Sequence, residues 1–355
     1  MLWRGRAQAS GGADAGSFAG LNRTMICDKP SMHLSATGAR FSQVRPGCMF
    51  HVFSFPNQRL LTMTEFDDEL RAVNQDIDHI VEQKPHIKTL LDAFGPLILE
   101  KTRLLLEMGD SKRTIAVDEV RYLGGIPLIQ QGNLFFPDDP WREMALAVSG
   151  AIQAGFPKLV GDMARLTEQI TSGRVDAYDY FRAPEAPDEK MIKDWAEHIP
   201  MASDALVLFL TIMSGIILTK RAREVAETIA PLSWNKGYCP VCGSFPMLAV
   251  TKKNWQNWLQ CSQCSHEWQF PRLKCPYCEH ENPKETNYFF IESEKDDKAY
   301  TCDECKKYLI TINRPAELRK VDHSITAIGL THLDLLLQHK GYAPMAICVW
   351  NTWNT

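Results

Sequence analysis

Four C-x-x-C pairs decide how this chain folds: Cys239-Pro-Val-Cys242, Cys261-Ser-Gln-Cys264, Cys275-Pro-Tyr-Cys278 and Cys302-Asp-Glu-Cys305. They contain eight of the 11 cysteines in the 355-residue chain. Each pair presents two sulfurs on one tight turn, called a knuckle below. Because a tetrahedral metal site takes two such pairs, the sequence predicts two metal sites.

The spacing between the knuckles indicates which cysteines share an ion. The intervals 243–260 and 279–301, inside the first two and the last two pairs, are each long enough for one β-hairpin. Knuckle, hairpin, knuckle is the order of a zinc ribbon or a rubredoxin-like unit. We therefore expect one ion on Cys239, Cys242, Cys261 and Cys264, and another on Cys275, Cys278, Cys302 and Cys305. Interleaved pairing, first with third and second with fourth, is the alternative.

The donor set limits the chemistry of these sites. Four sulfurs complete a tetrahedron and leave no position for water or substrate, which argues against Lewis-acid hydrolysis. Iron and zinc both accept four thiolates, so the residues alone do not choose between them. His266 and His280 adjoin knuckles, but we interpret them as surface histidines because eight cysteines already fill two sites. Gly243 suits a knuckle position that requires positive φ.

Around the knuckles, short runs rich in β-branched and aromatic residues predict strands. These runs cover residues 247–251, 257–260, 267–270, 287–291 and 307–312. Polar turns at 252–254 and 294–297 separate the halves of each expected hairpin. We interpret Trp255, Trp258 and Trp268 as cover for the knuckles, and an exposed tryptophan among them as a candidate partner anchor.

Before the cysteines, the apolar residues follow a helical period. Helical stripes run from Phe66 to Ile80, from Ile87 to Ile98 with a kink or restart expected at Gly95-Pro96, and from Leu159 to Ile170. Asp139 is expected to cap a helix that has Pro140 at its first position. Further helices are expected over residues 188–198 and 206–218.

The longest apolar stretch covers residues 205–218 and is interrupted by Thr211, Ser214 and Gly215. It is too short for a membrane-spanning helix, which needs about 20 apolar residues. We therefore interpret this stretch as a buried helix of the core.

The N-terminal segment 1–62 has a different composition, with many more basic than acidic side chains and no sustained period. A transit peptide, a disordered tail, or sequence upstream of the true start all fit. We favour the last two, because Met63 opens the first well-patterned helix. The expected organisation is an extension over 1–62, a helical domain over 63–232, a double metal-knuckle module over 233–313, and a C-terminal helix and tail over 314–355.

Charge argues against nucleic acid as a partner. The chain has 39 Lys+Arg and 43 Asp+Glu, and ten of each sign fall between residues 236 and 313. Four thiolates on a divalent ion leave a charge of −2, so two filled sites add about −4 to this balanced region. Nucleic-acid binding requires a basic face, and the composition provides none.

These residues resemble the FdhE family of formate dehydrogenase accessory proteins. The resemblance is carried by residues 234–246 (WNKGYCPVCGSFP), by Glu267-Trp268 and Tyr308-Leu309 after later knuckles, and by residues 322–342 with Leu333-Asp334 and Gly341-Tyr342. It covers about residues 64–345, and all eight cysteines match by position. The extension over 1–62 and the C-terminal segment 346–355 depart from the family.

The resemblance implies an α+β protein with a helical domain, a double rubredoxin-like or zinc-ribbon module and a C-terminal helix. It further implies a cytoplasmic, non-enzymatic maturation protein that binds the catalytic subunit of formate dehydrogenase. Two metal ions, each held by four cysteines, are implied as well, with iron favoured over zinc. Self-association is left open. Two other readings remain: a thiol or iron redox protein that carries electrons, and a zinc-ribbon adaptor for nucleic acid.

Overall fold

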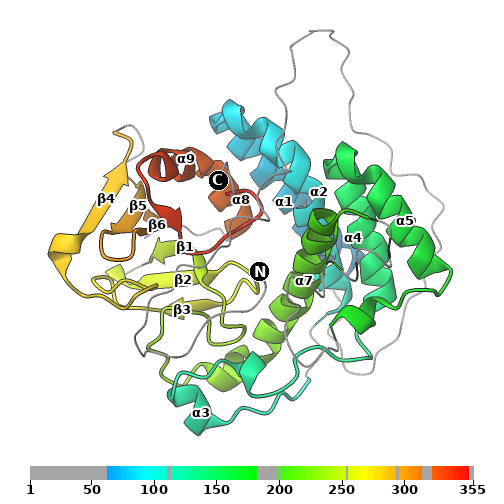
Figure 1. The fold of residues 1–355 in the computed structure, drawn as a ribbon, viewed down its shortest axis with the longest axis horizontal. Coiled ribbons are helices and arrows are strands. Elements are labelled where there is room, and N and C mark those ends of the chain that lie inside the picture. The colour runs from blue at the N-terminus through cyan, green and yellow to red at the C-terminus, as the bar shows by residue number, and fades with distance from the viewer. Residues whose placement is uncertain are drawn as a thin grey trace.

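The computed structural model describes residues 62–109, 113–181, 201–252, 255–292, 296–313 and 322–351, together with Lys193, Trp195 and Ile199. Helices form one half of this part of the chain, a mixed sheet forms the other, and the C-terminal helices lie between them (Figure 1). The predicted α+β fold class is confirmed. The extension predicted over residues 1–62 lies, except for Thr62, outside the described residues.

Helix α1, Met63–Gln83, begins with a capping box in which Thr62 and Glu65 exchange side-chain and backbone hydrogen bonds. After the 3-10 turn η1, Pro85–Ile87, helix α2 spans Lys88–Glu107 and continues through Pro96. The predicted restart at Gly95-Pro96 is therefore not found. Buried residues on both sides of Pro96, among them Phe94 and Leu97, keep the helix packed although Pro96 cannot donate its backbone hydrogen bond.

Helix α4, Trp141–Gly155, starts one residue later than predicted. Pro140 occupies its N-cap position, and no side chain caps the helix. The expected capping role of Asp139 is wrong, because this buried carboxylate accepts hydrogen bonds from the Phe136 amide at 3.0 Å and from the Arg221 guanidinium. A buried charge is tolerated only when it is paired, so the ion pair with Arg221 has priority over the cap.

The remaining elements of the helical half are short, except for α5. They are α3 (Glu119–Leu123), η2 (Leu128–Gln130), η3 (Pro157–Leu159), α5 (Val160–Thr171) and η4 (Ala177–Tyr180). The stripe predicted from Leu159 to Ile170 coincides with α5. The helix predicted over residues 188–198 falls, except for Lys193 and Trp195, outside the described part of the chain.

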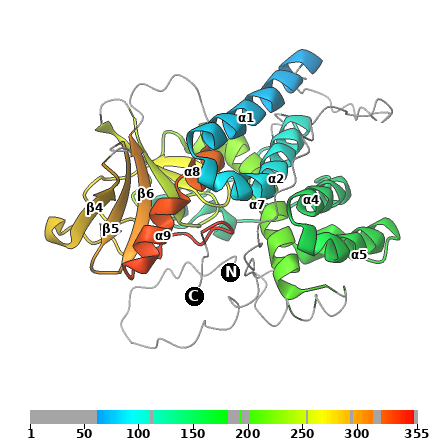
Figure 2. The same cartoon turned by 90° about the horizontal axis from the view of Figure 1, so that it is seen from above.

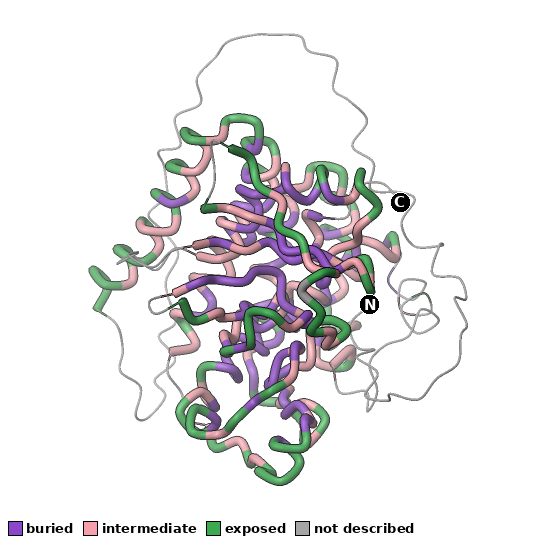
Figure 3. The backbone as a smooth tube through the Cα atoms, turned by 90° about the vertical axis from the view of Figure 1, so that its left-hand side faces the viewer, coloured by how far each residue is buried: buried purple, intermediate pink, exposed green. Residues whose placement is uncertain are grey.

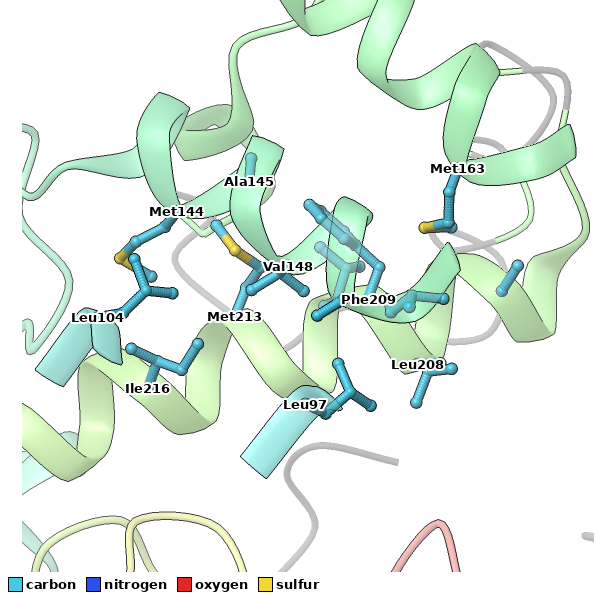
Figure 4. Close-up of a cluster of buried hydrophobic side chains, with 14 of the residues drawn as sticks. Leu97, Leu104, Met144, Ala145, Val148, Met163, Leu208, Phe209, Met213 and Ile216 are labelled. Carbon is cyan, nitrogen blue, oxygen red and sulfur yellow. The ribbon is translucent and has the colours of Figure 1, made fainter. Parts of the chain in front are cut away.

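Helix α7, Ser203–Ile229, is the central helix of this half. It is long and apolar enough to cross a membrane, but 83% of its most apolar window is buried inside the structure. Figure 4 shows its side chains Phe209, Met213 and Ile216 in one cluster with residues from α2, α4 and α5. The predicted buried helix is therefore confirmed as part of α7, in the core of the helical half.

The strands form one mixed sheet in the order β3-β2-β1-β6-β5-β4, with β7 paired to β6. They are β1 (Pro246–Thr251), β2 (Asn257–Cys261), β3 (Glu267–Gln269), β4 (Thr286–Phe290), β5 (Asp297–Cys302), β6 (Lys307–Asn313) and β7 (Ala343–Pro344). The parallel pair β1–β6, with Leu248 opposite Ile310, joins two antiparallel halves. Strand β5 was not among the five predicted runs, since its polar start obscures the pattern.

The two faces of the sheet differ because side chains alternate along each strand. Leu248, Ile310 and Ile312 point into a core shared with the C-terminal helices α8 (His323–Gly329) and α9 (Thr331–His339). Figure 3 shows buried segments of the chain gathered at the centre of the molecule. The expected C-terminal helix is two helices that meet at Leu330.

Seen from above, the layers follow one another as sheet, then α8 and α9, then α1, α2 and α7, then α4 and α5 (Figure 2). Helix α8 contacts α1 and α2 as well as β1, so it joins the two halves.

Candidate metal centres

The structure brings the eight cysteines into two groups of four, within each of which the sulfur atoms lie within 4.8 Å of one another. Cys239, Cys242, Cys261 and Cys264 form the first sulfur group, and Cys275, Cys278, Cys302 and Cys305 form the second sulfur group. The grouping is consecutive and not interleaved. In each group the second knuckle comes from the far end of the hairpin that follows the first.

The distances between sulfurs fit a tetrahedral ion. The Cys239–Cys264 and Cys242–Cys261 Sγ–Sγ distances are both 3.4 Å. In the second sulfur group, the Cys275–Cys305 and Cys278–Cys302 distances are 3.8 and 3.7 Å. A tetrahedron with metal–sulfur bonds of about 2.3 Å has edges of about 3.8 Å, whereas a disulfide is about 2.05 Å long. Both groups could therefore hold metal ions.

All four knuckles share one backbone conformation. The residue after the second cysteine of each pair has positive φ: 75° at Gly243, 56° at Ser265, 61° at Glu279 and 54° at Lys306. Positive φ at Gly243 confirms the expectation from sequence. A non-glycine residue in this region costs about 1–2 kcal/mol, so three knuckles are held in a strained form that the rest of the site must stabilise.

Backbone hydrogen bonds close the first three knuckles. The amides of Cys239, Cys261 and Cys275 donate to the carbonyls of Ser244, His266 and His280, at 2.8 to 2.9 Å. Within the second knuckle, the amides of Gln263 and Cys264 point at the Cys261 sulfur, at 3.4 and 3.5 Å. Amide donors lower the cost of burying a negatively charged thiolate.

The first sulfur group is sealed between the sheet and the helices, and all four of its cysteines are buried. Gln263 donates from Nε2 to the Thr211 carbonyl at 2.9 Å and to the Ser214 hydroxyl at 2.8 Å, both on α7. Lys101 on α2 donates from Nζ to the Ser265 hydroxyl at 3.0 Å. These contacts attach the second knuckle directly to the helical half.

Lys101 also places its side-chain nitrogen beside the first sulfur group. Burial lowers the pKa of its ammonium, while the nearby carboxylate of Asp322 and the sulfur of Cys264 act in the opposite direction. Thiolates around a divalent ion would carry net negative charge, which the half-buried Lys101, when protonated, would partly compensate.

The second sulfur group is open to solvent on one side. Cys278 is exposed and Cys305 is half-buried, whereas Cys275 and Cys302 are buried. Hydrogen bonding from Cys305 lowers the pKa of the Cys275 thiol to about 5, whereas burial raises the pKa of the Cys278 thiol to about 11. Lys274 and Lys236 pair with Glu279 at 3.1 and 3.6 Å and fix the outer edge of this knuckle.

The histidines and tryptophans predicted to lie near the knuckles are not members of either sulfur group. His266 and His280 are half-buried instead of lying at the surface as expected, and neither joins a sulfur group. Burial lowers the pKa of His266 to about 4, which keeps the ring neutral. Of the three tryptophans, Trp268 is buried and covers the first knuckle by donating to the Lys236 carbonyl at 3.1 Å. Trp255 is 66% exposed.

Sequence reasoning missed Lys101 and the docking role of Gln263. Gln263 lies inside a C-x-x-C pair, so its position beside the site was visible, but its partners on α7 depend on packing between distant segments. No signal in the sequence pointed to Lys101.

No family model matches the chain. It is 26% identical over 215 residues to Protein FdhE of Escherichia coli O127:H6 and to Protein FdhE of Shigella boydii serotype 18. This match covers 59% of the chain and spans 65% of the length of these relatives. The crystal structure of FdhE from Pseudomonas aeruginosa is similar with a TM-score of 0.49 and 20% identity, covering 80% of this chain and 95% of that one. The resemblance to FdhE proteins inferred from sequence is confirmed.

Proposed function

We propose that this chain is an accessory protein for formate dehydrogenase maturation, which binds the catalytic subunit of the dehydrogenase and has no enzymatic activity of its own. One observation carries the proposal: the eight cysteines form two groups of four sulfurs. A metal with four protein ligands has no open position for substrate, so such groups suit recognition and not hydrolysis. The similarity to FdhE proteins supports the same role.

The eight cysteines Cys239, Cys242, Cys261, Cys264, Cys275, Cys278, Cys302 and Cys305 are the proposed ligands of two metal ions. Iron is favoured by the family resemblance, and zinc is the alternative. A bound ion would join the two knuckles of its group, and an iron ion would also be able to transfer one electron. We also propose the units 63–232, 233–313 and 314–355 as the organisation of the protein, and the cytoplasm as its location.

Metal loading and partner binding can be tested on the same preparations. The full-length chain is purified anaerobically, its iron and zinc are measured, and capture of the formate dehydrogenase catalytic subunit is quantified. We expect about two ions per chain and specific capture. The double variant Cys239→Ala/Cys242→Ala should lose one ion and lose capture.

The matched control is Cys348→Ala, because Cys348 is a buried cysteine outside both sulfur groups. This variant should retain both ions and full capture. If metal-free protein captured the subunit as well as the loaded protein, the proposed role of the sulfur groups would be refuted.

A redox protein is the second candidate, and the second sulfur group favours it. Cys278 is exposed, and its sulfur lies 3.7 Å from that of Cys302, so an incoming thiol or disulfide can reach this pair. Disulfide reduction by the purified chain, or a reversible iron-centred absorbance change coupled to a donor, would support this candidate over the accessory role.

A further inference from the structure

We propose that a cleft on the open face of the sheet binds an acidic, extended segment of a partner protein. The cleft has a volume of about 240 Å³ and lies over β1, β6 and β5, on the face opposite to α8 and α9. Its floor contains Ala249, Leu309 and Thr311, which alternate with the residues that pack against the C-terminal helices.

Exposed aromatic side chains form the walls of the cleft. Trp255 is 66% exposed on one side, and Tyr288 and Phe290 on the edge strand β4 are 41% and 49% exposed. Aromatic side chains that remain in water over a hollow are typical of binding surfaces, because a partner gains free energy by covering them.

The charges of the cleft select an acidic ligand. Arg272 and Lys298 line it, and neither forms an ion pair within the described part of the chain. Both instead lie over aromatic rings, with the Arg272 guanidinium carbon 6.0 Å from the Trp255 ring centre and the Lys298 Nζ 5.9 Å from that of Phe290. The chain as a whole has a net charge of −4, so this is a local positive site on an acidic protein.

Two further charged side chains line the cleft, and both have partners. Lys274 pairs with Glu279 at 3.1 Å, and the carboxylate of Asp296 accepts a hydrogen bond from the Asn313 amide at 3.4 Å. The lining thus contains three cations and one anion, which leaves its balance positive.

The size of the cleft favours a segment of polypeptide over a small molecule. Pockets for cofactors and drug-sized ligands have volumes of about 300–1,000 Å³ and enclose most of the ligand. A hollow of about 240 Å³ holds one or two side chains while the rest of the segment lies outside. Nucleic acid would require a track of cations along its phosphates, and the two cations of the cleft that have no ion pair among the described residues do not form one.

The cleft is connected to the second sulfur group through Tyr300. This side chain lines the cleft, and it packs in one buried cluster with Cys275 and Cys302 of the second sulfur group. A segment bound over Tyr300 would therefore lie next to the more accessible metal centre. The identity of the partner, the dehydrogenase subunit, rests on the proposed function. The preference of the cleft for an acidic segment rests only on the residues that line it.

The test uses fluorescence anisotropy with the metal-loaded, full-length chain. The probe is a fluorescein-labelled octapeptide in which glutamate alternates with phenylalanine. Its comparison ligands are the same peptide with lysine in place of glutamate, and oligothymidine of equal length. We expect the acidic peptide to bind more tightly than both, and its affinity to rise as salt is lowered.

The double variant Arg272→Glu/Lys298→Glu should weaken binding of the acidic peptide by at least about tenfold, equivalent to about 1.4 kcal/mol. Trp255→Ala should weaken it by removing one wall. The matched control is Lys158→Glu/Arg174→Glu, which reverses two exposed cations on the helical half and should leave the affinity unchanged. Metal content and circular dichroism verify that all variants are folded.

Equal binding by the cleft variant and the control would overturn the inference, as would tighter binding of oligothymidine. Capture of the dehydrogenase subunit separates the two proposals. If wild type and cleft variant capture it equally, the cleft is not the docking site and the proposed function stands. If neither captures it while the peptide binds in the cleft as expected, the proposed function fails and the inference holds.

Discussion

The two sulfur groups have the same backbone design but different surroundings. The first is buried on all sides and attached to α2 and α7 through Lys101 and Gln263. The second lies at the far half of the sheet, where Cys278 is exposed. The same donor set thus has two different settings: the first group joins the sheet to the helices, and the second remains accessible to solvent.

The largest expected difference concerns stability. A structural zinc site contributes on the order of 10 kcal/mol to a small domain, and the first sulfur group also lies in the contact between the two halves. Cys239→Ala/Cys242→Ala should therefore lower the thermal stability of the helices as well as the sheet. Cys275→Ala/Cys278→Ala should unfold only the outer half of the sheet.

The measurement is thermal unfolding followed by far-ultraviolet circular dichroism, with ion content determined for each variant. If both double variants lost helical stability to the same extent, the first group would have no special role in joining the halves.

The second prediction concerns Asp334 on α9, which braces the outer half of the sheet by accepting a hydrogen bond from the Tyr308 hydroxyl at 2.7 Å. Burial raises the pKa of this carboxyl from 3.8 to about 7. Between these values the unfolded chain releases a proton that the folded chain keeps, so stability falls as pH rises, by up to about 1.4 kcal/mol per pH unit. Above about pH 7 the carboxyl is ionised in the folded protein as well, and the full loss of stability is present.

Asp334→Asn keeps an acceptor for Tyr308 and removes the titration. The free energy of unfolding in urea should therefore vary less between pH 5 and pH 8 in the variant, and the variant should be the more stable protein at the higher pH. Asp68→Asn, at an exposed position on α1, is the control and should follow the wild type. Parallel curves for wild type and Asp334→Asn would contradict the assignment.

The third prediction concerns the contact between the two groups. A Cβ added to Gly237 would lie 1.8 Å from the carbonyl oxygen of Pro276, which is inside the third knuckle. Gly237→Ala must therefore push the first and third knuckles apart, at a cost of roughly 1–3 kcal/mol. Gly132→Ala adds a Cβ with no neighbour within 4 Å and should cost less. Thermal unfolding of the two variants gives the comparison, and equal stability would show that the knuckles are not held this closely.

The smallest effect is kinetic. A thiol reagent added with a chelator should label the second group before the first, because Cys278 is already in contact with solvent. We expect labelling of the second group to be at least about tenfold faster, a difference of about 1.4 kcal/mol in barrier. Mass spectrometry of digested samples at successive times assigns the labels, and simultaneous labelling of all eight cysteines would show that the groups open together.

Local signals predicted most of this architecture. The spacing of the cysteines indicated consecutive grouping, and Gly243 indicated the knuckle conformation. Apolar periodicity located α1 and α5, and a continuous apolar stretch located α7. Each of these depends on residues close together in the chain.

What could not be predicted depends on distant residues. Continuation of α2 through Pro96 follows from packing in the core, and the role of Asp139 follows from Arg221, 82 residues later. The parallel pairing of β1 with β6 and the cleft above it arise only when both halves of the sheet are assembled. The grouping of the cysteines could therefore be predicted from sequence, while the contrasting exposure of the two groups could not.

The parallel pairing of β1 with β6 has a consequence for synthesis on the ribosome. Strand β1 ends at Thr251, but its parallel neighbour begins only at Lys307, and the helices that cover the sheet come later still. The first hairpin thus emerges with an unpaired edge and an uncovered apolar face, a form prone to association with other nascent chains. Early metal capture by its two knuckles would hold this half in register until translation supplies the rest.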